Sequence, residues 1–225
     1  MLKYLLISRK GSGQTFTQNL LKNNSVKVSC TYSDQLKHDE LAAANVIPIS
    51  PEHVEEICKL FPNDIFRIVM ITAKNEDRLK HRTEPDTASF VDDCTKENDT
   101  FCSFEDKFAK GKLGIDNVMQ GQIINNDFSA TSDVISFAKQ LPKKLLAFER
   151  MRAIVNSLVE DNFFETVVNE NGQAMINTTF HSNATNETFE RLVSVDAVVE
   201  QMFLDDASLA HAIRQWLHSD ILSKI

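Results

Sequence analysis

The sequence LKYLLISRKGSGQT at residues 2–15 decides the fold, because an apolar run ends there in a turn that contains two glycines. The run at residues 2–7 has the length of a strand, and Phe16, Leu20 and Leu21 beyond the turn have the spacing of a helix. The chain is therefore predicted to open with a strand, a turn and a helix.

The same alternation continues through the first part of the chain. Further strand-like runs, separated by helical patterns, lie at residues 26–31, 45–49, 65–72 and 122–125. The run IFRIVMIT at residues 65–72 is almost wholly apolar, which is typical of a strand buried on both faces of a parallel sheet. Pro48 donates no ladder hydrogen bond and so places its strand at a sheet edge or a strand end. We therefore predict an α/β fold with helices on both faces of a mainly parallel sheet.

Residues 143–225 are predicted to form a mostly helical C-terminal extension. The sequence Pro142-Lys143-Lys144 marks its boundary with the first domain, residues 1–142. We expect an amphipathic helix over residues 145–159, then a hairpin of residues 166–168 and 174–176 around 169–172. Two more helical patterns run through Phe189, Leu192, Val199 and Phe203, and through Leu209, Ile213, Trp216 and Leu217. The exposed apolar faces of these helices suit a homodimer contact.

The composition is that of an ordinary soluble globular protein, with 42% hydrophobic and 25% charged residues among 225. A net charge of -8 argues against nucleic acid or an anionic membrane as a partner, since both attract clustered Lys and Arg. The apolar run at residues 4–7 is far too short for a signal sequence or a membrane span. The four cysteines lack C-x-x-C spacing and are interpreted as reduced, mostly buried thiols. We expect a cytoplasmic protein.

The turn at residues 8–15 has features of a phosphate-binding loop. Glycines allow successive backbone N–H groups to point at phosphate oxygens, and a helix N-terminus adds the positive end of its dipole. In the motif G-x-x-x-x-G-K-[ST], the lysine reaches the phosphates and the hydroxyl group binds Mg²⁺. Here Gly13 and Thr15 match, whereas Ser8 replaces the first glycine and Gln14 replaces the lysine. A glycine turn between a strand and a helix is also a common structural device, and this alternative stays open.

Three segments in the same order resemble the guanylate kinases, a family of P-loop nucleoside-monophosphate kinases. Residues 7–15 are similar to the family's loop S-G-P-S-G-S-G-K-S-T. Residues 61–66 lead to the sequence RLKHR at residues 78–82, which is similar to the family's R-L-x-x-R lid entry. Residues 123–128, IINNDF, are similar to its V-N-D-D-L segment after the last strand. The resemblance covers residues 1 to about 142 and implies a P-loop three-layer α/β/α fold.

The resemblance also implies an activity, the transfer of the γ-phosphoryl group of ATP to a nucleoside monophosphate with Mg²⁺ as cofactor. Arg78 and Arg82 would close over the transferring group as catalytic residues, and Asn125 and Asp127 would bind the purine base. The phosphates would be held by Lys10, Gly11, Ser12, Gly13, Gln14 and Thr15, and Thr15 would also bind the metal. Without the resemblance, the arginines fit a solvated helix surface, and Asn125 and Asp127 fit a turn followed by a helix start.

The sequence departs from the family pattern where the reaction needs charge. Gln14 supplies no positive charge, and the loss of one preorganised donor to developing negative charge costs about 2.7–4 kcal/mol. The family's acceptor-binding insert is not visible between Cys30 and Asn45, and no acidic residue ends the strand at residues 45–49. Two functions therefore remain open. One is a nucleotide-binding protein with or without kinase activity, and the other is a degenerate kinase fold serving as a scaffold or interaction module.

Overall fold

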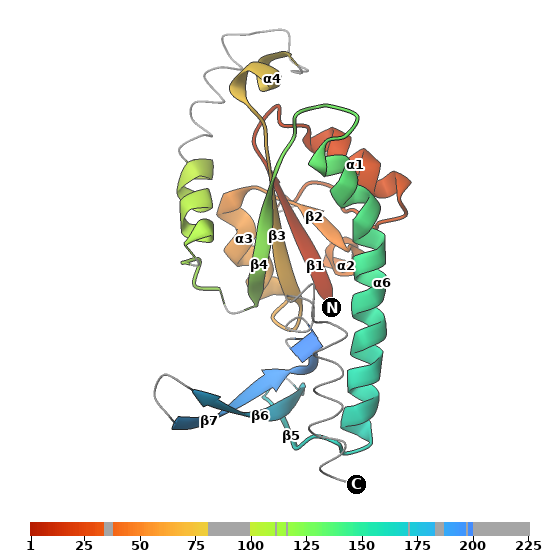
Figure 1. Cartoon of the computed structure of the whole chain (residues 1–225), viewed down its shortest axis with the longest axis vertical. Helices are drawn as coiled ribbons and strands as arrows, with labels where there is room; N and C mark the ends of the chain where they lie inside the picture. Colours follow the sequence, from red (N-terminus) through yellow and green to blue (C-terminus); the bar gives the residue numbers. More distant parts are fainter. Residues whose placement is uncertain are drawn as a thin grey trace. The chain divides into compact units, whose positions relative to one another are not determined.

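The computed structural model divides the chain into two compact units, Met1–Lys143 and Lys144–Ile225 (Figure 1). The described residues are 1–33, 38–80, 100–110, 112–115, 117–170, 172–182, 187–196 and 198–199. Each unit has a sheet of its own.

The sheet of the first unit has four parallel strands in the order β2-β1-β3-β4. Their bounds are Leu2–Ser8 for β1, Val46–Pro48 for β2, Ile65–Thr72 for β3 and Val118–Asn125 for β4. β1 pairs with β3 along its whole length, since both are apolar runs that tolerate burial on two faces. The predicted α/β fold with a parallel sheet is confirmed, and Pro48 lies in an edge strand, as predicted.

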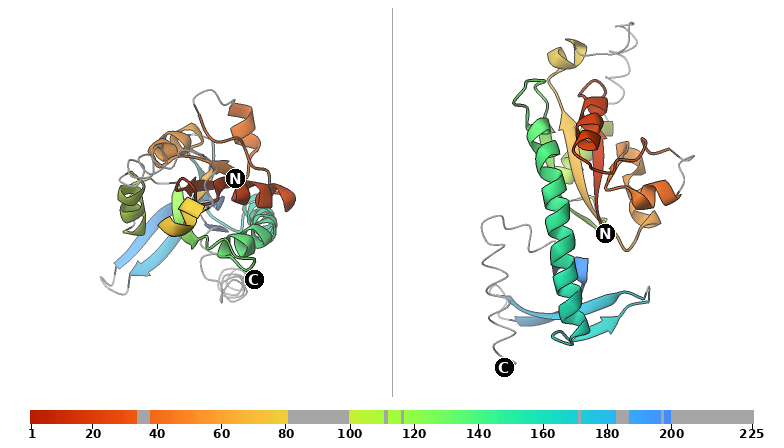
Figure 2. Two further views of the ribbon diagram at one scale, coloured as in Figure 1. Left: turned by 90° about the horizontal axis from the view of Figure 1, so that it is seen from above. Right: turned by 90° about the vertical axis from the view of Figure 1, so that its right-hand side faces the viewer.

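Helices cover both faces of this sheet (Figure 2). On one face lie α1 (Gln14–Asn23) and the first turns of α6 (Asp133–Glu160), where the rings of Tyr4 and Phe137 pack 6.2 Å apart. The elements of the other face are α2 (His38–Ala43), η1 (Pro51–His53), α3 (Val54–Leu60) and the helical residues 100–109. The core beneath them is built from Leu5, Ile7, Leu41, Ile57, Phe66, Ile68, Met70 and Phe101. After β3 comes the short helix α4 (Asn75–Lys80).

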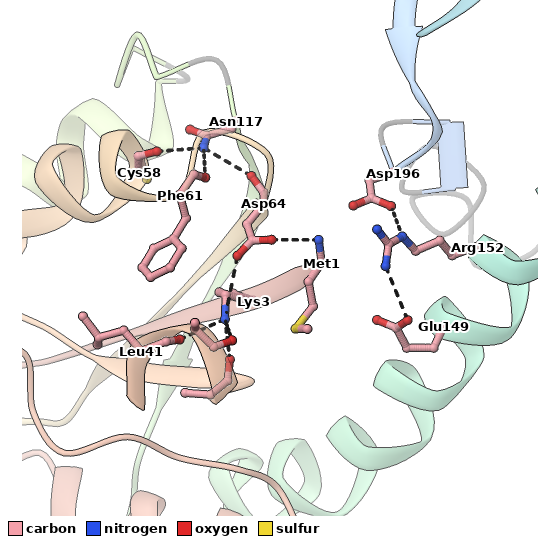
Figure 3. A network of polar contacts seen from close by, with 12 residues as sticks. Met1, Lys3, Leu41, Cys58, Phe61, Asp64, Asn117, Glu149, Arg152 and Asp196 are labelled. Carbon is pink, nitrogen blue, oxygen red and sulfur yellow. Dashed lines mark hydrogen bonds and ion pairs between the residues drawn. The ribbon is translucent and has the colours of Figure 1, made fainter. Parts of the chain in front are cut away.

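A buried lysine closes the core at the N-terminal edge of the sheet (Figure 3). Lys3 is fully buried, and burial lowers the pKa of its amine despite the carboxylate of Asp64 at 3.7 Å. Its Nζ donates hydrogen bonds of 2.9, 2.7 and 2.8 Å to the carbonyl oxygens of Leu41, Ala42 and Ala44. Lys3 thereby satisfies carbonyl groups at the end of α2 that the helix itself leaves without a donor.

Asn117 is a hydrogen-bond donor to the carbonyl groups at the end of α3. Its Nδ2 donates to the carbonyl oxygens of Cys58, Phe61 and Asp64 at 3.1, 3.2 and 3.2 Å. One side chain just before β4 therefore fixes the end of α3 and the turn that leads into β3 (Figure 3).

The strand predicted at residues 26–31 is wrong. These residues run beside β2 but form a single parallel bridge, between Val28 and Val46. Farther along, the N–H of Tyr32 donates to the carbonyl oxygen of Pro48 at 2.7 Å. β2 is three residues long and ends at Pro48, so it is too short to support a ladder on its outer side.

The boundary predicted at Pro142 and the separate helix predicted over residues 145–159 are replaced by one helix that continues through Pro142. α6 runs without interruption from Asp133 to Glu160, although proline inside a helix removes a hydrogen bond and costs about 3 kcal/mol. The compensation is a buried stripe at seven-residue spacing, formed by Val134, Leu141, Phe148 and Val155. Neither α6 nor any other helix among the described residues is long and apolar enough to cross a membrane.

The second unit contains a three-stranded antiparallel sheet beside the end of α6. Its strands are β5 (Thr166–Val168), β6 (Ala174–Ser182) and β7 (Glu187–Ser194), in the order β5-β6-β7. The predicted hairpin of β5 and β6 is confirmed, and Gly172 in its turn has a φ of 74°, which glycine adopts without strain.

The helical pattern predicted through Phe189, Leu192, Val199 and Phe203 is wrong for its first half, because Phe189 and Leu192 lie in β7, whereas residues 195–196 and 198–199 are helical and Phe203 lies outside the described residues. The spacing of Phe189 and Leu192 fits a helix, but β7 pairs with β6 from Glu187 to Ser194, and this long-range pairing overrides the local pattern. The described part of this unit is therefore a helix with a sheet rather than mostly helical. The final helix predicted through residues 209–217 lies outside the described residues.

Candidate functional site

The loop after β1 lies where a parallel sheet presents a binding crevice. From β1 the chain moves to β2 on one side and then returns to β3 on the other side of β1. The carboxyl ends of β1 and β3 are therefore a topological switch point, the position at which open α/β sheets bind ligands. Residues 9–13, here named the glycine loop, leave β1 at this point and lead into α1 (Figure 1).

The backbone of the glycine loop depends on its two glycines. The N–H of Ser12 donates to the carbonyl oxygen of Arg9 at 2.9 Å, which closes a turn. Gly11 and Gly13 have φ angles of 75° and 91°, whereas Lys10 and Ser12 are not among the residues with positive φ. Alternating backbone of this kind forms a concavity of N–H groups that suits an anion.

The N-terminus of α1 continues this array of donors. Gly13 is the N-cap, no side chain caps the helix, and no acidic residue lies in the first turn. The hydrogen bond from the N–H of Thr17 to the carbonyl oxygen of Gly13, at 2.9 Å, begins the helical pattern. The N–H groups of Gln14 and Thr15 therefore have no acceptor within the helix, and the positive end of the helix dipole is not neutralised by its own first turn.

Asn126, which the sequence interpretation missed, holds this loop from the end of β4. Its side chain is fully buried, and its Nδ2 donates to the carbonyl oxygen of Ser12 at 2.9 Å. Its Oδ1 accepts hydrogen bonds from the N–H of Phe128 at 3.0 Å and the hydroxyl of Ser132 at 3.1 Å. A Cβ atom on Gly13 would lie 2.5 Å from Nδ2, so the amide packs directly against the loop.

Arg78 holds the loop at a second carbonyl group. The side chain is 2% exposed, and its Nε donates to the carbonyl oxygen of Lys10 at 2.7 Å. Its Nη1 donates to Oδ1 of Asn75 at 3.2 Å, which ties the guanidinium to α4. The structure thus brings Arg78 to the predicted loop, but against the backbone of the loop. Arg82, its predicted companion, lies outside the described residues.

The predicted base-binding residues, Asn125 and Asp127, flank Asn126 and are exposed. The Oδ1 of Asp127 accepts a hydrogen bond of 3.0 Å from the N–H of Ser129, and this bond lowers the pKa of the carboxyl group. That contact is typical of a turn before a helix, in agreement with the alternative interpretation of Asp127. Burial distinguishes Asn126 from its neighbours, and the run Asn-Asn-Asp in the sequence contains no signal for it.

Arg9 is engaged with the helical residues 100–109. Its Nη2 lies 3.0 Å from Oε2 of Glu105 and 3.1 Å from Sγ of Cys102. The guanidinium also lies over the ring of Phe101, at 4.7 Å from the centroid. Phe101 is a core residue, so Arg9 links the glycine loop to the core.

The described residues do not build a protein-held magnesium site. No group of three or more His, Cys, Asp or Glu side chains in this part of the chain could hold a metal ion. β2 is followed by Ile49 and Ser50, which offer no carboxylate, and Thr15 is exposed at the start of α1. Hydroxyl contact by Thr15 alone does not fit a dedicated Mg²⁺ site, which is normally supplied by carboxylates together with the phosphates of a substrate.

A pocket of about 400 Å³ lies apart from the glycine loop, between the end of α3 and the segment before β4. Its lining includes Glu55, Cys58 and Lys59, and burial raises the pKa of the Cys58 thiol to about 12. Burial therefore disfavours the reactive thiolate form of Cys58 at neutral pH. Cys30 and Cys102 are exposed, so the expectation of mostly buried thiols is wrong for the described cysteines.

Comparison with known proteins gives no family for the chain. No family model matches it, and no curated protein matches it. One solved structure, the crystal structure of an uncharacterized protein from Eubacterium ventriosum ATCC 27560, is similar at 12% identity and a TM-score of 0.35. The similarity covers 64% of this chain and 97% of that protein, and at this TM-score it carries no argument about function.

Proposed function

We propose that the first unit binds the phosphate groups of a purine nucleotide at the glycine loop and the N-terminus of α1. The observation that carries the proposal is the backbone of the loop, in which Gly11 and Gly13 have positive φ beside an uncapped helix start. Such an array of N–H groups favours anions through hydrogen bonds and through the helix dipole. The loop also lies at the switch point of a parallel sheet, where such sheets bind their ligands. This position favours a binding loop over a purely structural turn.

Binding is favoured over rapid phosphoryl transfer. Gln14 can donate a hydrogen bond from its amide, but it supplies no charge to the transferring group. The guanidinium of Arg9 is occupied by Glu105, and that of Arg78 by the carbonyl oxygen of Lys10. Since phosphoryl transfer depends on cations that neutralise developing charge, kinase activity towards a nucleoside monophosphate is the weaker part of the proposal.

An interaction module with a kinase-like fold is the second candidate function. It is favoured by the exposed apolar side chains of β5, where Val167 and Val168 are 49% and 67% exposed in an edge strand. An edge strand leaves backbone groups available for pairing with another chain, including a second copy of this protein. Under this alternative the glycine loop would be a structural turn without a ligand.

Titration with nucleotides separates the two candidates. We would add ATP, GMP and inorganic pyrophosphate, each with and without MgCl2, and follow the thermal midpoint Tm and the heat of binding. A ligand present at 100 times its Kd should stabilise the fold by about 2.7 kcal/mol. The absence of a shift with every ligand would leave the interaction module as the function. If a nucleotide binds, a coupled assay for ADP release with each nucleoside monophosphate would test turnover.

A further inference from the structure

We propose that Arg78 and Asn126 are positioning residues that aim the N–H groups of Gly11 and Gly13 at the ligand before the ligand arrives. The proposal rests on the proposed phosphate-binding function and adds the means by which the site is built. Neither side chain touches the ligand. Each acts through a peptide group of the glycine loop.

The planar trans peptide bond fixes the directions of the two N–H groups. In such a group the C=O of one residue and the N–H of the next point in opposite directions. Arg78 donates to the carbonyl oxygen of Lys10, so the N–H of Gly11 points away from Arg78. Asn126 donates to the carbonyl oxygen of Ser12, so the N–H of Gly13 points away from Asn126. Two alternate peptide groups of the loop are thus held by their oxygens.

Both N–H groups remain available for a ligand. The N–H of Ser12, which lies between them in the sequence, is used within the loop by the carbonyl oxygen of Arg9. Among the described residues no acceptor is paired with the N–H of Gly11 or of Gly13. The loop therefore uses the N–H of Ser12 in its own turn. The N–H groups of Gly11 and Gly13, each of which follows a carbonyl group held by a side chain, stay available to a ligand.

The two side chains are themselves held firmly. Asn126 receives two hydrogen bonds at Oδ1, from Phe128 and Ser132, and its own N–H donates to the carbonyl oxygen of Thr72 at 2.7 Å. Arg78 is almost fully buried and is tied to Asn75. Because the supports are fixed, the glycines are held in their binding conformation without the ligand, and binding does not have to meet the entropy cost of ordering them.

This role for Arg78 differs from that implied by the resemblance, in which the arginine closes over the transferring phosphoryl group. A donor on the carbonyl oxygen also polarises the peptide group and strengthens the N–H on its other side as a donor. Arg78 and Asn126 would therefore raise affinity for an anion without contacting it.

A sample labelled with 15N-glycine tests the proposal residue by residue, since the chain has six glycines. Inorganic pyrophosphate is the probe. In the wild-type protein we expect it to move the signals of Gly11 and Gly13, while Gly121 and Gly172 stay in place as internal controls.

Two variants separate the two supports. Asn126→Asp replaces the donor to Ser12 by a carboxylate and should alter the ligand-free signal of Gly13. Arg78→Lys keeps the charge but loses the planar Nε donor, and it should alter the ligand-free signal of Gly11. Each variant should bind pyrophosphate about tenfold more weakly, the effect of losing one well-placed hydrogen bond. A side chain needed only for stability would lower Tm and leave both the Kd and the ligand-free glycine signals unchanged.

The proposal is overturned if folded Asn126→Asp and Arg78→Lys proteins keep wild-type glycine signals and wild-type affinity. If Asn126→Asp does not fold, Asn126→Ser also removes the amide donor to the carbonyl oxygen of Ser12, and wild-type behaviour of this variant would have the same meaning. A wild-type protein whose glycine signals ignore pyrophosphate would contradict the proposed function instead. In that case the ligand-free signals of the variants still decide whether the two side chains position the loop.

Discussion

The side-chain amide of Asn126 donates a hydrogen bond of 2.9 Å to the carbonyl oxygen of Ser12, a residue 114 positions earlier in the chain. The bond is buried, and it joins the connection between β4 and α6 to the glycine loop after β1. Two segments far apart in sequence therefore share one constraint at the carboxyl edge of the sheet. A substitution in the glycine loop should therefore alter the connection between β4 and α6, and the reverse.

Gly13→Ala tests this contact from the side of the loop. The new Cβ would lie 2.5 Å from Nδ2 of Asn126, and alanine would have to adopt a φ of 91°. We expect a loss of about 2–3 kcal/mol in the free energy of unfolding, since backbone strain of 1–2 kcal/mol adds to the clash. Chemical denaturation measures the loss.

Gly114→Ala is the matched control for that variant. Gly114 also has a positive φ, 66°, but a Cβ there would meet no atom within 4 Å. It should therefore show the backbone strain alone, about 1–2 kcal/mol. Equal losses at the two positions would mean that the contact between Asn126 and the loop does not constrain the fold.

Gly121→Ala should destabilise the first unit for a different reason. Gly121 lies in β4, beside the irregularity in pairing between Arg67 and Val69, and a Cβ there would lie 1.8 Å from the carbonyl oxygen of Ile68. The atom that blocks it is backbone, so β4 would have to move away from β3. We expect a loss of about 3 kcal/mol or more. Urea denaturation measures the free energy of unfolding of the variant. A value close to that of the wild type would contradict the close approach of these strands.

The parallel sheet could be predicted because its evidence is local. β1 and β3 are apolar runs of strand length, and Pro48 marks an edge whatever its surroundings. The course of α6 could not be predicted in this way. Pro142 is a helix breaker by local rules, and the burial of side chains such as Leu141 and Phe148, which offsets its cost, exists only after the chain has folded.

The candidate site, too, has some features that the local sequence predicts and others that only the tertiary structure determines. The glycines of the loop could be found from the sequence, because positive φ at a strand-to-helix turn calls for glycine. Asn126 could not be told from Asn125 and Asp127, since the three are nearly equivalent in a turn and only the tertiary structure buries the middle one. Arg78 was found, but its partner is a backbone oxygen, which no sequence pattern records.

Lys3→Met should destabilise the first unit at neutral pH by about 2 kcal/mol. The variant leaves the carbonyl groups at the end of α2 without their buried donor, and unsatisfied buried acceptors cost about 1–3 kcal/mol. Urea denaturation of the two proteins at pH 7 measures the difference.

The pH dependence of this difference follows from the lowered pKa of Lys3. Between the folded pKa and the ordinary lysine pKa of 10.5, the unfolded chain binds more protons at this amine than the folded chain does. Wild-type stability from this group therefore rises with pH in the window below 10.5, whereas Lys3→Met has no such term. The gap between the two proteins should widen as the pH rises towards 10.5. A gap that narrows would contradict a pKa lowered by burial.

Arg152→Met should destabilise the second unit. The Nε of Arg152 lies 2.6 Å from Oδ1 of Asp196, whose side chain is 4% exposed, although the angles are those of an ion pair rather than of an aligned hydrogen bond (Figure 3). Removal of the arginine leaves a buried carboxylate without this partner. Because Arg152 is 36% exposed and partly screened by solvent, we expect about 1–3 kcal/mol.

Glu149→Gln is the control for Arg152. Glu149 lies 3.8 Å from the same guanidinium but is 50% exposed, so its loss should change stability by less than about 0.5 kcal/mol. Thermal unfolding of the full chain measures both variants. If Glu149→Gln costs as much as Arg152→Met, the buried ion pair with Asp196 is not what stabilises this unit.

Gln14→Lys should supply a positive charge at position 14, where the chain has a neutral amide. Position 14 is the first residue of α1, where a cation opposes the helix dipole, so the ligand-free protein should lose about 0.3–1 kcal/mol. A bound pyrophosphate would reverse this effect, because the ammonium group then faces negative charge. We expect pyrophosphate to bind at least about tenfold more tightly, since a charge-assisted hydrogen bond contributes about 1.5–3 kcal/mol.

Gln18→Lys, one turn farther along α1, separates this local effect from the change in net charge. It should alter affinity by less than about twofold, because a charge one turn away from the helix start lies farther from the ligand and is screened by salt. Calorimetric titration of both variants with pyrophosphate at two salt concentrations compares them. If the two lysines strengthen binding equally, and high salt abolishes both effects, the N-terminus of α1 is not a specific phosphate site. A gain confined to Gln14→Lys, together with a gain in ATP turnover, would mean that the loop retains the geometry of a kinase and lacks only its charge.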